Sequence, residues 1–474
     1  MSMKKYLFIN GDWEEGDSYS DLKSPYSRMK IAEIAQASTD QVNKAIDCAE
    51  AAFDRMKKLS SYERSNILEQ LVNLLTINKD KAAEIISLES AKPLKFAISE
   101  VERTIETYKF AAEEAKRISG EVLPINAAKN GANKIGFTIH EPIGVIAAIT
   151  PFNFPMNLVA HKVGPAIAAG NTIVLKPASQ TPLSSIFLTE LLNQTDLPKG
   201  AFNLITGSGK VVGDVLVENE KVKMVTFTGS PEIGKDIKSR AGLKKVSLEL
   251  GSNAGLIIDK DIDVDSIIDK CVIGSFSNQG QVCISLQRIY VHEQISDEFI
   301  SKFKAKTENL VLGDPLNIET DISVLISDND TTRAKNWIDE AIAEGASVTT
   351  GCAIENQILK PTILTDVPHT SKISCQEAFA PVVIVNKFSN VEEAIQQINN
   401  SKYGLQAGIF TTNISNASQA IKLLEVGGVI INDVPTFRVD HMPYGGVKDS
   451  GNCREGIKYA IEEMTELKLV IWNH

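Results

Sequence analysis

Short apolar runs that alternate with helical stretches constrain the fold of this chain more than any other feature. From residue 141 onward, four such runs have the length and composition of buried strands, at 144–149, 172–175, 202–205 and 224–227. Helical patterns lie between them, at 157–169, 183–192 and 211–218. Because buried strands that alternate with helices form parallel sheets covered on both faces, we predict an α/β fold with a doubly wound parallel sheet.

A second α/β stretch follows this one along the chain. Its predicted strands lie near 256–258, 288–292, 382–385, 408–411 and 429–431. We therefore expect two sheet-based units rather than one.

The segments outside these two stretches have other patterns. The first 118 residues favour helices: capping boxes at 38–41 and 60–63 precede periodic segments, and a third helix is predicted over 96–118. Residues 120–133 resemble a loop and 134–140 alternate like an exposed strand. Residues 466–471 alternate weakly, which predicts an edge strand or one that crosses to another subunit.

Composition excludes several classes of protein. The chain of 474 residues is 43% hydrophobic and 23% charged, so it is not intrinsically disordered. Its net charge of −11 argues against nucleic acid and anionic membranes as main partners. The uncharged stretch 144–160 is interrupted by Pro151 and Pro155, which argues against a membrane helix. The six cysteines form no C-x-x-C pair and no signal-peptide pattern is present, so we expect reduced thiols, a cytoplasmic location and no metal requirement.

Two segments have features of phosphate-binding turns, and a third lies where a ligand could bind. Residues 205–213 place Gly209 and Gly213 between a predicted strand and a helix, in an imperfect G-x-G-x-x-G pattern. Residues 227–235 repeat this arrangement, and their helix N-terminus could face a phosphate. Lys176 and Ser179 follow the carboxyl end of another buried strand, where open α/β sheets bind ligands. Taken singly, each feature is also explained by an ordinary turn or a solvated lysine.

Three residues form a candidate catalytic set. Cys283 is preceded by glycine and side-chain amides, which are unusual neighbours for an inert core thiol. Glu249 lies in an apolar run, where its charged form must be paired or its pKa raised. Asn153, held between two prolines at a strand end, could donate a hydrogen bond to a developing oxyanion. The alternatives are a buried thiol, a surface carboxylate and a turn-forming asparagine.

Seven short motifs follow one another along the chain: PFNFP at 151–155, LKPA at 175–178, FTGS at 227–230, ELGS at 249–252, NQGQVC at 278–283, EAFAP at 377–381 and PYGGVKDSG at 443–451. Taken in this order, they resemble the motifs of the aldehyde dehydrogenase superfamily over nearly the whole chain. Within it, residues 283–288 and 432–443 are most similar to the lactaldehyde dehydrogenase-like group, which lies near non-phosphorylating glyceraldehyde-3-phosphate and phosphonoacetaldehyde dehydrogenases.

The resemblance implies an architecture of three parts. A Rossmann-type NAD(P)-binding domain would comprise residues 1–118 and 141–251, and an α/β catalytic domain residues 252–440. A small β extension for oligomerisation would combine 119–140 with 455–474. The resemblance therefore implies a homodimer or a homotetramer.

The resemblance also implies roles for individual residues. Cys283 would attack the aldehyde, Asn153 would hold the oxyanion and Glu249 would activate the water that hydrolyses the thioester. Lys162, with Glu455, matches a pair given proton-relay roles in relatives. The remaining positions match the cofactor site, in which Glu377 would hold the nicotinamide ribose and Phe379 would pack near the ring: Thr150, Pro151, Phe152, Lys176, Ser179, Gly209, Gly213, Phe227, Gly229, Ser230, Leu250, Glu377 and Phe379.

Departures from the family pattern refine the cofactor prediction. Ser179 stands where many relatives have an acid that binds the adenosine ribose, so repulsion of a 2′-phosphate is removed and Lys176 could pair with it. We therefore predict that NADP is at least tolerated. Phe152 replaces a frequent Trp, as in CoA-acylating relatives, but those enzymes typically lack the glutamate base that this chain keeps. Asn452 and Cys453 replace a small residue and a glycine, and the sequence alone does not explain this change.

The substrate is predicted from fewer residues. Arg103 and Arg438 match positions that approach the substrate anion in phosphorylated-aldehyde relatives, although Arg103 could instead pair with a neighbour on its own helix. A third arginine expected in those relatives is Val282 here. His161 and Gln281 are further candidates for the pocket wall.

These residues leave more than one function open. Our leading hypothesis is oxidation of a short polar 2-hydroxyaldehyde, such as lactaldehyde or glyceraldehyde, to the acid with NAD(P). An anionic aldehyde, such as glyceraldehyde 3-phosphate, phosphonoacetaldehyde or a semialdehyde, is the close alternative. A CoA-acylating enzyme, a non-catalytic nucleotide-binding protein and a cysteine hydrolase are less favoured.

Overall fold

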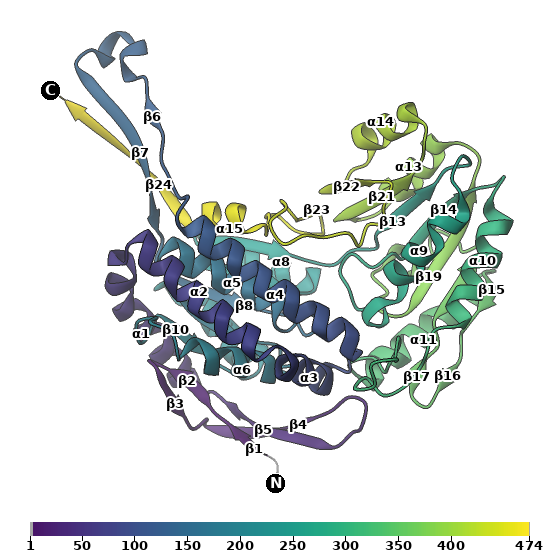
Figure 1. The fold of residues 1–474 in the computed structure, drawn as a ribbon, viewed down its shortest axis with the longest axis horizontal. Coiled ribbons are helices and arrows are strands. Elements are labelled where there is room, and N and C mark those ends of the chain that lie inside the picture. The colour runs from purple at the N-terminus through teal and green to yellow at the C-terminus, as the bar shows by residue number, and fades with distance from the viewer. Residues whose placement is uncertain (1–2, 474) are drawn as a thin grey trace.

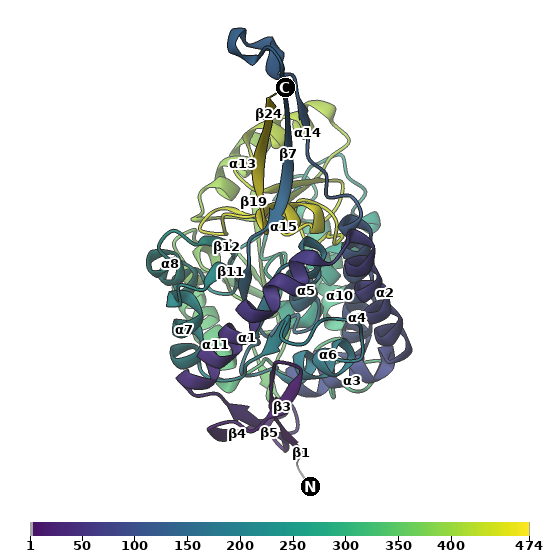
Figure 2. The same cartoon turned by 90° about the vertical axis from the view of Figure 1, so that its left-hand side faces the viewer.

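The computed structural model describes residues 3–473 and contains two seven-stranded sheets, each covered by helices, with a long β arm projecting from the body (Figure 1). Figure 2 shows the same arm from the side, with the amino-terminal strands at the opposite end of the molecule. Within residues 3–473, none of the helices combines the length and apolar character needed to cross a bilayer.

The first sheet is the doubly wound sheet predicted from the alternating apolar runs. The five strands from one edge, β12 to β10, are parallel, and β2 adds to β10 in the antiparallel direction. Residues of β8 and β9 are buried on both faces, which explains why these strands have continuous apolar sequences. The strand order is β12 (Lys245–Glu249), β11 (Val222–Thr228), β8 (Val145–Ile149), β9 (Thr172–Lys176), β10 (Phe202–Leu204), β2 (Leu7–Ile9) and β3 (Asp12–Glu14).

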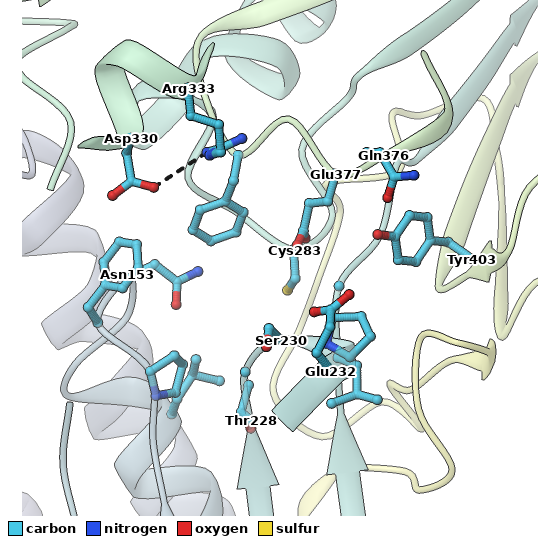
Figure 3. A pocket seen from close by; sticks show the side chains of 18 of the residues that line it. Asn153, Thr228, Ser230, Glu232, Cys283, Asp330, Arg333, Gln376, Glu377 and Tyr403 are labelled. Carbon is cyan, nitrogen blue, oxygen red and sulfur yellow. Dashed lines mark hydrogen bonds and ion pairs between the residues drawn. The ribbon is translucent and has the colours of Figure 1, made fainter. Parts of the chain in front are cut away.

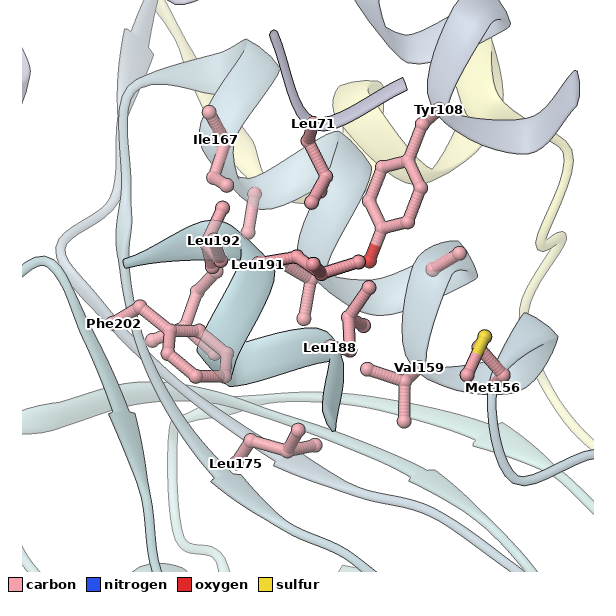
Figure 4. Packing of buried hydrophobic residues seen from close by; sticks show 14 of the residues in the cluster. Leu71, Tyr108, Met156, Val159, Ile167, Leu175, Leu188, Leu191, Leu192 and Phe202 are labelled. Atoms are coloured by element: carbon pink, nitrogen blue, oxygen red, sulfur yellow. The ribbon is translucent and has the colours of Figure 1, made fainter. Parts of the chain in front are cut away.

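Helices cover both faces of this sheet. Both predicted capping boxes are present, at the N-termini of α1 and α2. Figure 4 shows residues of α2, α4, α5 and α6 packed above β9 and β10 in one apolar cluster. The helices are α1 (Thr39–Lys58), α2 (Ser61–Ile77), α3 (Lys79–Ser90), α4 (Leu94–Ala115), α5 (Asn157–Ala169), α6 (Leu183–Leu192), α7 (Asp214–Glu218) and α8 (Pro231–Arg240).

The prediction that the first 118 residues are mainly helical is wrong for the beginning of the chain. A three-stranded sheet of β1 (Met3–Lys5), β5 (Lys30–Gln36) and β4 (Ser18–Lys23) precedes α1, and β2 and β3 join the first large sheet. β2 and β3 form a hairpin through Asn10 and Gly11, which both have positive φ, so the sequence carried a local Asn-Gly turn signal that the prediction missed. The helix α3 was also not predicted.

The second sheet carries the five strands predicted for it. Six of its strands are parallel, and β15 is antiparallel to β18 at one edge. The order is β15 (Ser347–Thr350), β18 (Thr362–Thr365), β19 (Val382–Phe388), β14 (Arg288–His292), β13 (Gly255–Ile258), β21 (Gln406–Phe410) and β22 (Gly428–Ile431). The associated helices are α9 (Ile268–Phe276), α10 (Ser296–Glu308), α11 (Asp328–Ala343), α12 (Lys372–Cys375), α13 (Val391–Asn399) and α14 (Ile414–Leu423).

The arm joins segments far apart in sequence. β24 (Thr465–Asn473) pairs antiparallel with β7 (Lys134–Pro142), and β6 (Val122–Leu123) pairs with the other edge of β7. The predicted strands at 134–140 and 466–471 are therefore present. The preceding helix, α15 (Ile457–Glu463), packs instead into the core beside the first sheet. Two short pairs complete the fold: β16 (Ile354–Glu355) with β17 (Ile358–Leu359), and β20 (Tyr403–Gly404) with β23 (Val447–Lys448).

Candidate active site

The connections of the first sheet create a crevice at the carboxyl ends of β8 and β11. These strands are neighbours, but the chain continues from β8 to β9 on one side and from β11 to β12 on the other. Open α/β sheets bind ligands at such a reversal of strand order. The loop after β8 supplies Asn153 and the loop after β11 supplies Ser230, and both line a cavity of about 800 Å³.

The second unit provides the opposite wall of this cavity. Figure 3 shows Cys283 pointing into it, with Asn153 on one side and Glu377 and Tyr403 on the other. The predicted residues that line the cavity are Pro151, Phe152, Asn153, Gly229, Ser230, Leu250, Cys283, Glu377 and Phe379.

A strained turn presents Cys283 to the cavity. Asn278, Gln279 and Gly280 have positive φ values of 50°, 55° and 70°, a left-handed run that is costly for residues other than glycine. A Cβ at position 280 would lie 2.1 Å from the carbonyl oxygen of Ala380, so only glycine fits without a shift of the backbone. This turn explains the glycine and amides before the cysteine.

Asn153 is buried next to this turn. Its Nδ2 donates to the carbonyl oxygen of Gln281 at 3.0 Å, and Nδ2 of Asn278 donates to the Asn153 carbonyl at 3.3 Å. Since a side-chain amide has two N–H donors, one remains for a ligand oxygen. Asn153 is thus fixed on the same cavity wall as the thiol.

The Cys283 thiol is partly exposed and uncharged at rest. Burial of its sulfur raises the thiol pKa to about 11, although the Tyr444 hydroxyl and the Arg438 charge act in the opposite direction. The Tyr444 Oη lies 2.9 Å from Sγ. Forming the reactive thiolate therefore requires help from its surroundings.

Glu249, the last residue of β12, is buried and is not among the residues that line the large cavity. Burial, and then the charge of Glu455, raises its pKa well above the ordinary value. The Cys453 thiol donates to Glu249 Oε1 at 3.6 Å. Position 453, whose residue the sequence alone did not explain, is therefore in contact with the candidate base.

A buried polar network lies behind the thiol and connects α4, α5 and the 438–455 segment. Lys162 Nζ lies 3.1 Å from Glu455 Oε1, so the pair predicted from the resemblance is in contact. Arg438 Nη2 lies 3.1 Å from Glu455 Oε2. His161 Nε2 lies 2.9 Å from Asp440 Oδ1 and 3.1 Å from Arg438 Nη2.

Arg103 does not form the ion pair within its own helix that the sequence left open. It binds Asp440 through two hydrogen bonds, of 2.7 and 3.2 Å, rather than Glu100 or Glu106 on its own helix. Glu100 instead pairs with the buried Lys92. The preference has a physical reason, because a bidentate arginine–carboxylate pair is favoured over a helical neighbour pair.

A second cavity, of about 290 Å³, lies on the other side of the thiol. Arg103 and Arg438 line it together with the unpredicted Lys92, and Val282 and Phe154 form part of its apolar wall. Cys283 and Leu158 are the residues that line both cavities. The thiol therefore stands where the large and the small cavity meet.

The prediction that His161 and Gln281 line the pocket is wrong. Neither is among the residues that line the two cavities. His161 is bound within the polar network, and Gln281 Oε1 accepts the backbone N–H of Ile326 at 3.0 Å. Both side chains satisfy buried hydrogen bonds, so they support the cavity walls from behind.

Comparison with known proteins identifies the family. The model of the aldehyde dehydrogenase family matches residues 13–470. The chain belongs to the aldehyde dehydrogenase family. It is an oxidoreductase that uses NAD(P) to oxidise aldehydes, as the resemblance implied.

Named relatives of this aldehyde dehydrogenase act on short aldehydes. A 3-sulfolactaldehyde dehydrogenase from Priestia aryabhattai is 46% identical over 472 residues, which cover 99% of this chain and 98% of the relative. A lactaldehyde dehydrogenase from Methanococcus aeolicus is 42% identical over 471 residues, or 98% and 100% of the two chains. The crystal structure of a glyceraldehyde-3-phosphate dehydrogenase from Methanocaldococcus jannaschii, complexed with NADP, has a TM-score of 0.92 at 41% identity, covering 97% and 100%.

The residues around the large cavity fit the nicotinamide end of the cofactor. Gly251 leaves room beside Glu377, since a Cβ there would lie 2.5 Å from Glu377 Oε2. Thr150 was predicted for this site but does not line the large cavity, and its Oγ1 is buried without a hydrogen-bond partner among residues 3–473. The Phe227 ring closes the space beside Gly229, where a Cβ would lie 2.4 Å from it.

The predicted adenosine side lies along the same sheet edge. Lys176 ends β9, and Ser179 Oγ donates to the Gly207 carbonyl at 3.3 Å. Burial lowers the pKa of Lys176 to about 8. Gly209 and Gly213 bound a one-turn helix after β10, with open space where each Cβ would be.

Several residues of this site were not predicted. Asp330, Arg333 and Trp337 line the large cavity from one face of α11, a spacing of three and four that could have indicated a shared helix face. The other unpredicted lining residues include Glu232, Lys372, Gln376 and Tyr403. Asp440 and Tyr444 carry no local signal beyond the loop motif in which they lie.

Proposed function

We propose that this aldehyde dehydrogenase oxidises a three-carbon 2-hydroxyaldehyde with a terminal anionic group to the corresponding acid, and that it accepts NADP. The observation that carries this proposal is the shared position of Cys283. It lines one cavity suited to a nicotinamide and another that contains Arg103 and Arg438.

The proposed reaction begins at the sulfur. The Cys283 thiol first gives its proton to water in the large cavity that it lines. The thiolate then forms a bond to the aldehyde carbon, and the carbonyl electron pair moves to oxygen, where Asn153 Nδ2 and the Cys283 backbone N–H donate hydrogen bonds. NAD(P), when bound, supplies the acceptor for the hydride that leaves this carbon. Cys283 is then acylated as a thioester.

Hydrolysis completes the proposed reaction. Glu249 takes a proton from water, which attacks the thioester carbon, and the acid leaves as sulfur regains its electron pair. Because Glu249 lies outside the walls of both cavities, its side chain must turn toward the acyl group for this step. The charges of Glu455 and Lys162 act on Glu249, and this ion pair is the proposed route for the proton.

An anionic substrate is supported by the charges of the small cavity. Three cations line it, Lys92, Arg103 and Arg438, against one carboxylate, Glu100, and guanidinium groups bind anions. Arg103 uses two of its donors for Asp440 and keeps others. A relative named for sulfolactaldehyde, whose substrate carries a sulfonate, agrees with this proposal.

A neutral hydroxyaldehyde such as lactaldehyde is the second candidate. The apolar part of the small cavity, which includes Phe96, Val282 and Ile284, favours it, and so does the relative named lactaldehyde dehydrogenase. The volume of about 290 Å³ suits a short substrate in either case.

The acceptance of NADP is supported by the predicted adenosine side. Ser179 provides a hydroxyl where an acid would repel a 2′-phosphate, and Lys176 is a buried cation close by in sequence. The division into a cofactor domain, a catalytic domain and an oligomerisation arm, and assembly as a dimer or tetramer, are part of the same proposal.

The test is a panel of aldehydes assayed by the absorbance of the reduced cofactor. We expect kcat/KM for 3-sulfolactaldehyde or glyceraldehyde 3-phosphate to exceed that for lactaldehyde by about tenfold or more, since hydrogen bonds to charged groups contribute about 1.5–3 kcal/mol. Comparison of the two anions separates a sulfonate from a phosphate preference. A higher kcat/KM for lactaldehyde would reject the anionic substrate.

The same assay tests the reaction type. Turnover that requires CoA would replace hydrolysis by acyl transfer, and absence of turnover with every aldehyde would reject the proposed substrate class. Cys283→Ser should lose nearly all oxidation, because a serine hydroxyl at this site is far less nucleophilic than a thiolate.

A further inference from the structure

Tyr444 is a buried side chain in contact with the reacting sulfur. It lies in the PYGG segment between α14 and α15, and 2% of its surface is exposed. Its Oη is 2.9 Å from Cys283 Sγ. The roles implied by the family resemblance give this hydroxyl no function.

One face of the Tyr444 ring packs against a cation, the Arg438 guanidinium. The Arg438 guanidinium carbon is 3.7 Å from the ring centroid. Arg438 is held in turn by Glu455, at 3.1 Å. A cation on the face of a phenol attracts the ring electrons and makes the hydroxyl a stronger hydrogen-bond donor.

We propose that Tyr444 is a catalytic residue, whose hydroxyl donates a hydrogen bond to the Cys283 thiolate once it has formed, and so stabilises and directs the charged nucleophile until it attacks the aldehyde. The proposal rests on the function proposed above for Cys283. It adds a donor to the sulfur, separate from the donors that Asn153 and the backbone supply to the oxygen.

The direction of the hydrogen bond follows from the charge on sulfur. A thiol can donate or accept, but a thiolate has no proton and can only accept, so the tyrosine must then be the donor. Burial raises the pKa of Tyr444 well above its ordinary value, and the phenol therefore keeps its proton. Tyr444 and Arg438 are the groups around Cys283 that favour the thiolate, whereas burial, Glu249 and Glu377 disfavour it.

The proton of Tyr444 stays on its oxygen throughout the proposed step. The thiolate electron pair forms the C–S bond, the carbonyl electron pair moves to oxygen, and the hydrogen bond from Tyr444 weakens as sulfur loses its charge. When the acid leaves, the electron pair returns to sulfur and the hydrogen bond forms again. The hydroxyl thus stabilises the nucleophile before attack and the leaving thiolate after hydrolysis.

The test is the Tyr444→Phe variant, which keeps the ring on Arg438 and removes one oxygen. The rate at which iodoacetamide modifies Cys283 is followed against pH by mass spectrometry of its peptide. We expect the profile to move to higher pH by about one to two units, the effect of losing a hydrogen bond to a charged group. At a pH below both pKa values, the variant has less thiolate, but its more basic thiolate is more nucleophilic. The two effects partly cancel, so the alkylation rate should fall about three- to tenfold.

Steady-state kinetics provide a second measurement on the same variant. The acid limb of kcat/KM against pH should move in the same direction as the alkylation profile. A role in packing alone would lower the melting temperature or change KM without moving either profile.

Tyr290→Phe is the matched control. Tyr290 lies in β14 and is fully buried, and its hydroxyl has no hydrogen-bond partner among residues 3–473. This variant should keep both profiles of the unmodified enzyme. An alkylation profile of Tyr444→Phe that is unchanged, or that moves to lower pH, would overturn the proposal.

Failure of the proposed function gives a different result. Alkylation needs no aldehyde, so an incorrect substrate class would leave the shift between the unmodified enzyme and the Tyr444→Phe variant intact. An incorrect nucleophile would appear as retained oxidation in Cys283→Ser.

Discussion

At the scale of single residues, the surroundings shift the pKa values of two carboxyl groups near the nucleophile in opposite directions. Burial and the charge of Glu455 raise the pKa of Glu249 well above the ordinary value. Although burial opposes it, contact with Lys162 and Arg438 lowers the pKa of Glu455 to about 2. Groups whose pKa values are pushed apart in this way divide into a proton carrier and a permanent charge. Glu249 fits the first role and Glu455 the second.

This division predicts the behaviour of Glu249→Gln. Oxidation up to the thioester does not need the carboxylate, so mixing with aldehyde and cofactor should give a burst of about one reduced cofactor per active site, seen by stopped-flow absorbance. Loss of the base should then slow turnover about 10²–10⁴-fold. Glu463→Gln, on α15 and bonded to Ser247 of the same strand as Glu249, is the control and should keep normal turnover. A variant without a burst would show that Glu249 acts before the thioester forms.

Lys176 predicts a pH dependence that distinguishes the two cofactors. Burial lowers its pKa to about 8, so the free enzyme carries this charge below that pH and loses it as the pH rises. If the ammonium pairs with the 2′-phosphate, KM for NADP should increase above about pH 8 and KM for NAD should stay flat. Lys176→Met should lower kcat/KM for NADP about ten- to a hundredfold relative to NAD.

Lys199→Met is the control, because this exposed lysine pairs with Asp12 far from the sheet edge. Parallel pH profiles of the two cofactors would contradict the pairing of Lys176 with the phosphate.

At the scale of elements, the sequence was most informative where local signals were strong. The capping boxes at Ser38 and Ser60 locate helix starts, and the apolar runs locate the strands of both sheets. The strands before residue 37 and the helix α3 were missed. The Asn10-Gly11 turn was a local signal for the β2–β3 hairpin, whereas the pairing of β2 with β10 joins segments far apart in sequence. The resemblance led to residues at the strand ends, whereas the α11 face with Arg333 and Trp337 came only from the structure.

The turn before the nucleophile predicts an effect of glycine substitution. In Gly280→Ala, the new methyl group would meet the Ala380 carbonyl at 2.1 Å and the φ of +70° would be strained. We expect a loss of stability of about 1–3 kcal/mol from the backbone strain alone. Because the turn carries Cys283, kcat/KM should fall further than the melting temperature suggests. Both quantities are measurable by thermal unfolding and steady-state assay.

Gly242→Ala is the control that separates the effect of backbone strain from the effect of the steric clash with Ala380. Gly242 has a similar φ, +63°, but nothing lies within 4 Å of the added Cβ. It should lose stability and keep its activity. Equal activity in the two variants would show that the turn can move without displacing the thiol.

At the scale of the whole molecule, the arm exposes apolar side chains that the body does not cover. β24 and β7 expose several of them, among them Leu467, Leu469, Ile471, Trp472 and Ile135. An exposed apolar ribbon of this kind is typical of a protein contact, and we propose that it contacts a second copy of the chain. Apart from the Lys162–Glu455 pair, the polar network could not be predicted from sequence, because Arg103, His161 and Asp440 come from separate segments that only the packing of the chain brings together.

The arm predicts a dependence of assembly on its apolar residues. The double variant Leu469→Glu, Ile471→Glu should lower the molar mass measured by light scattering below that of the unmodified enzyme, because charges on this ribbon would have to be buried in the contact. Ile414→Glu, at an exposed position on α14, is the control and should assemble normally. An unchanged mass in the double variant would place the subunit contact elsewhere.

The meeting of two cavities at one sulfur has a consequence for the order of release. The large cavity and the small one have separate walls apart from Cys283 and Leu158. In the proposed reaction, the reduced cofactor can therefore dissociate while the acyl group is still bound to Cys283. Water for the hydrolysis can then enter the large cavity that the cofactor has left. Product inhibition should accordingly follow an ordered pattern, in which the carboxylic acid is the last species to dissociate.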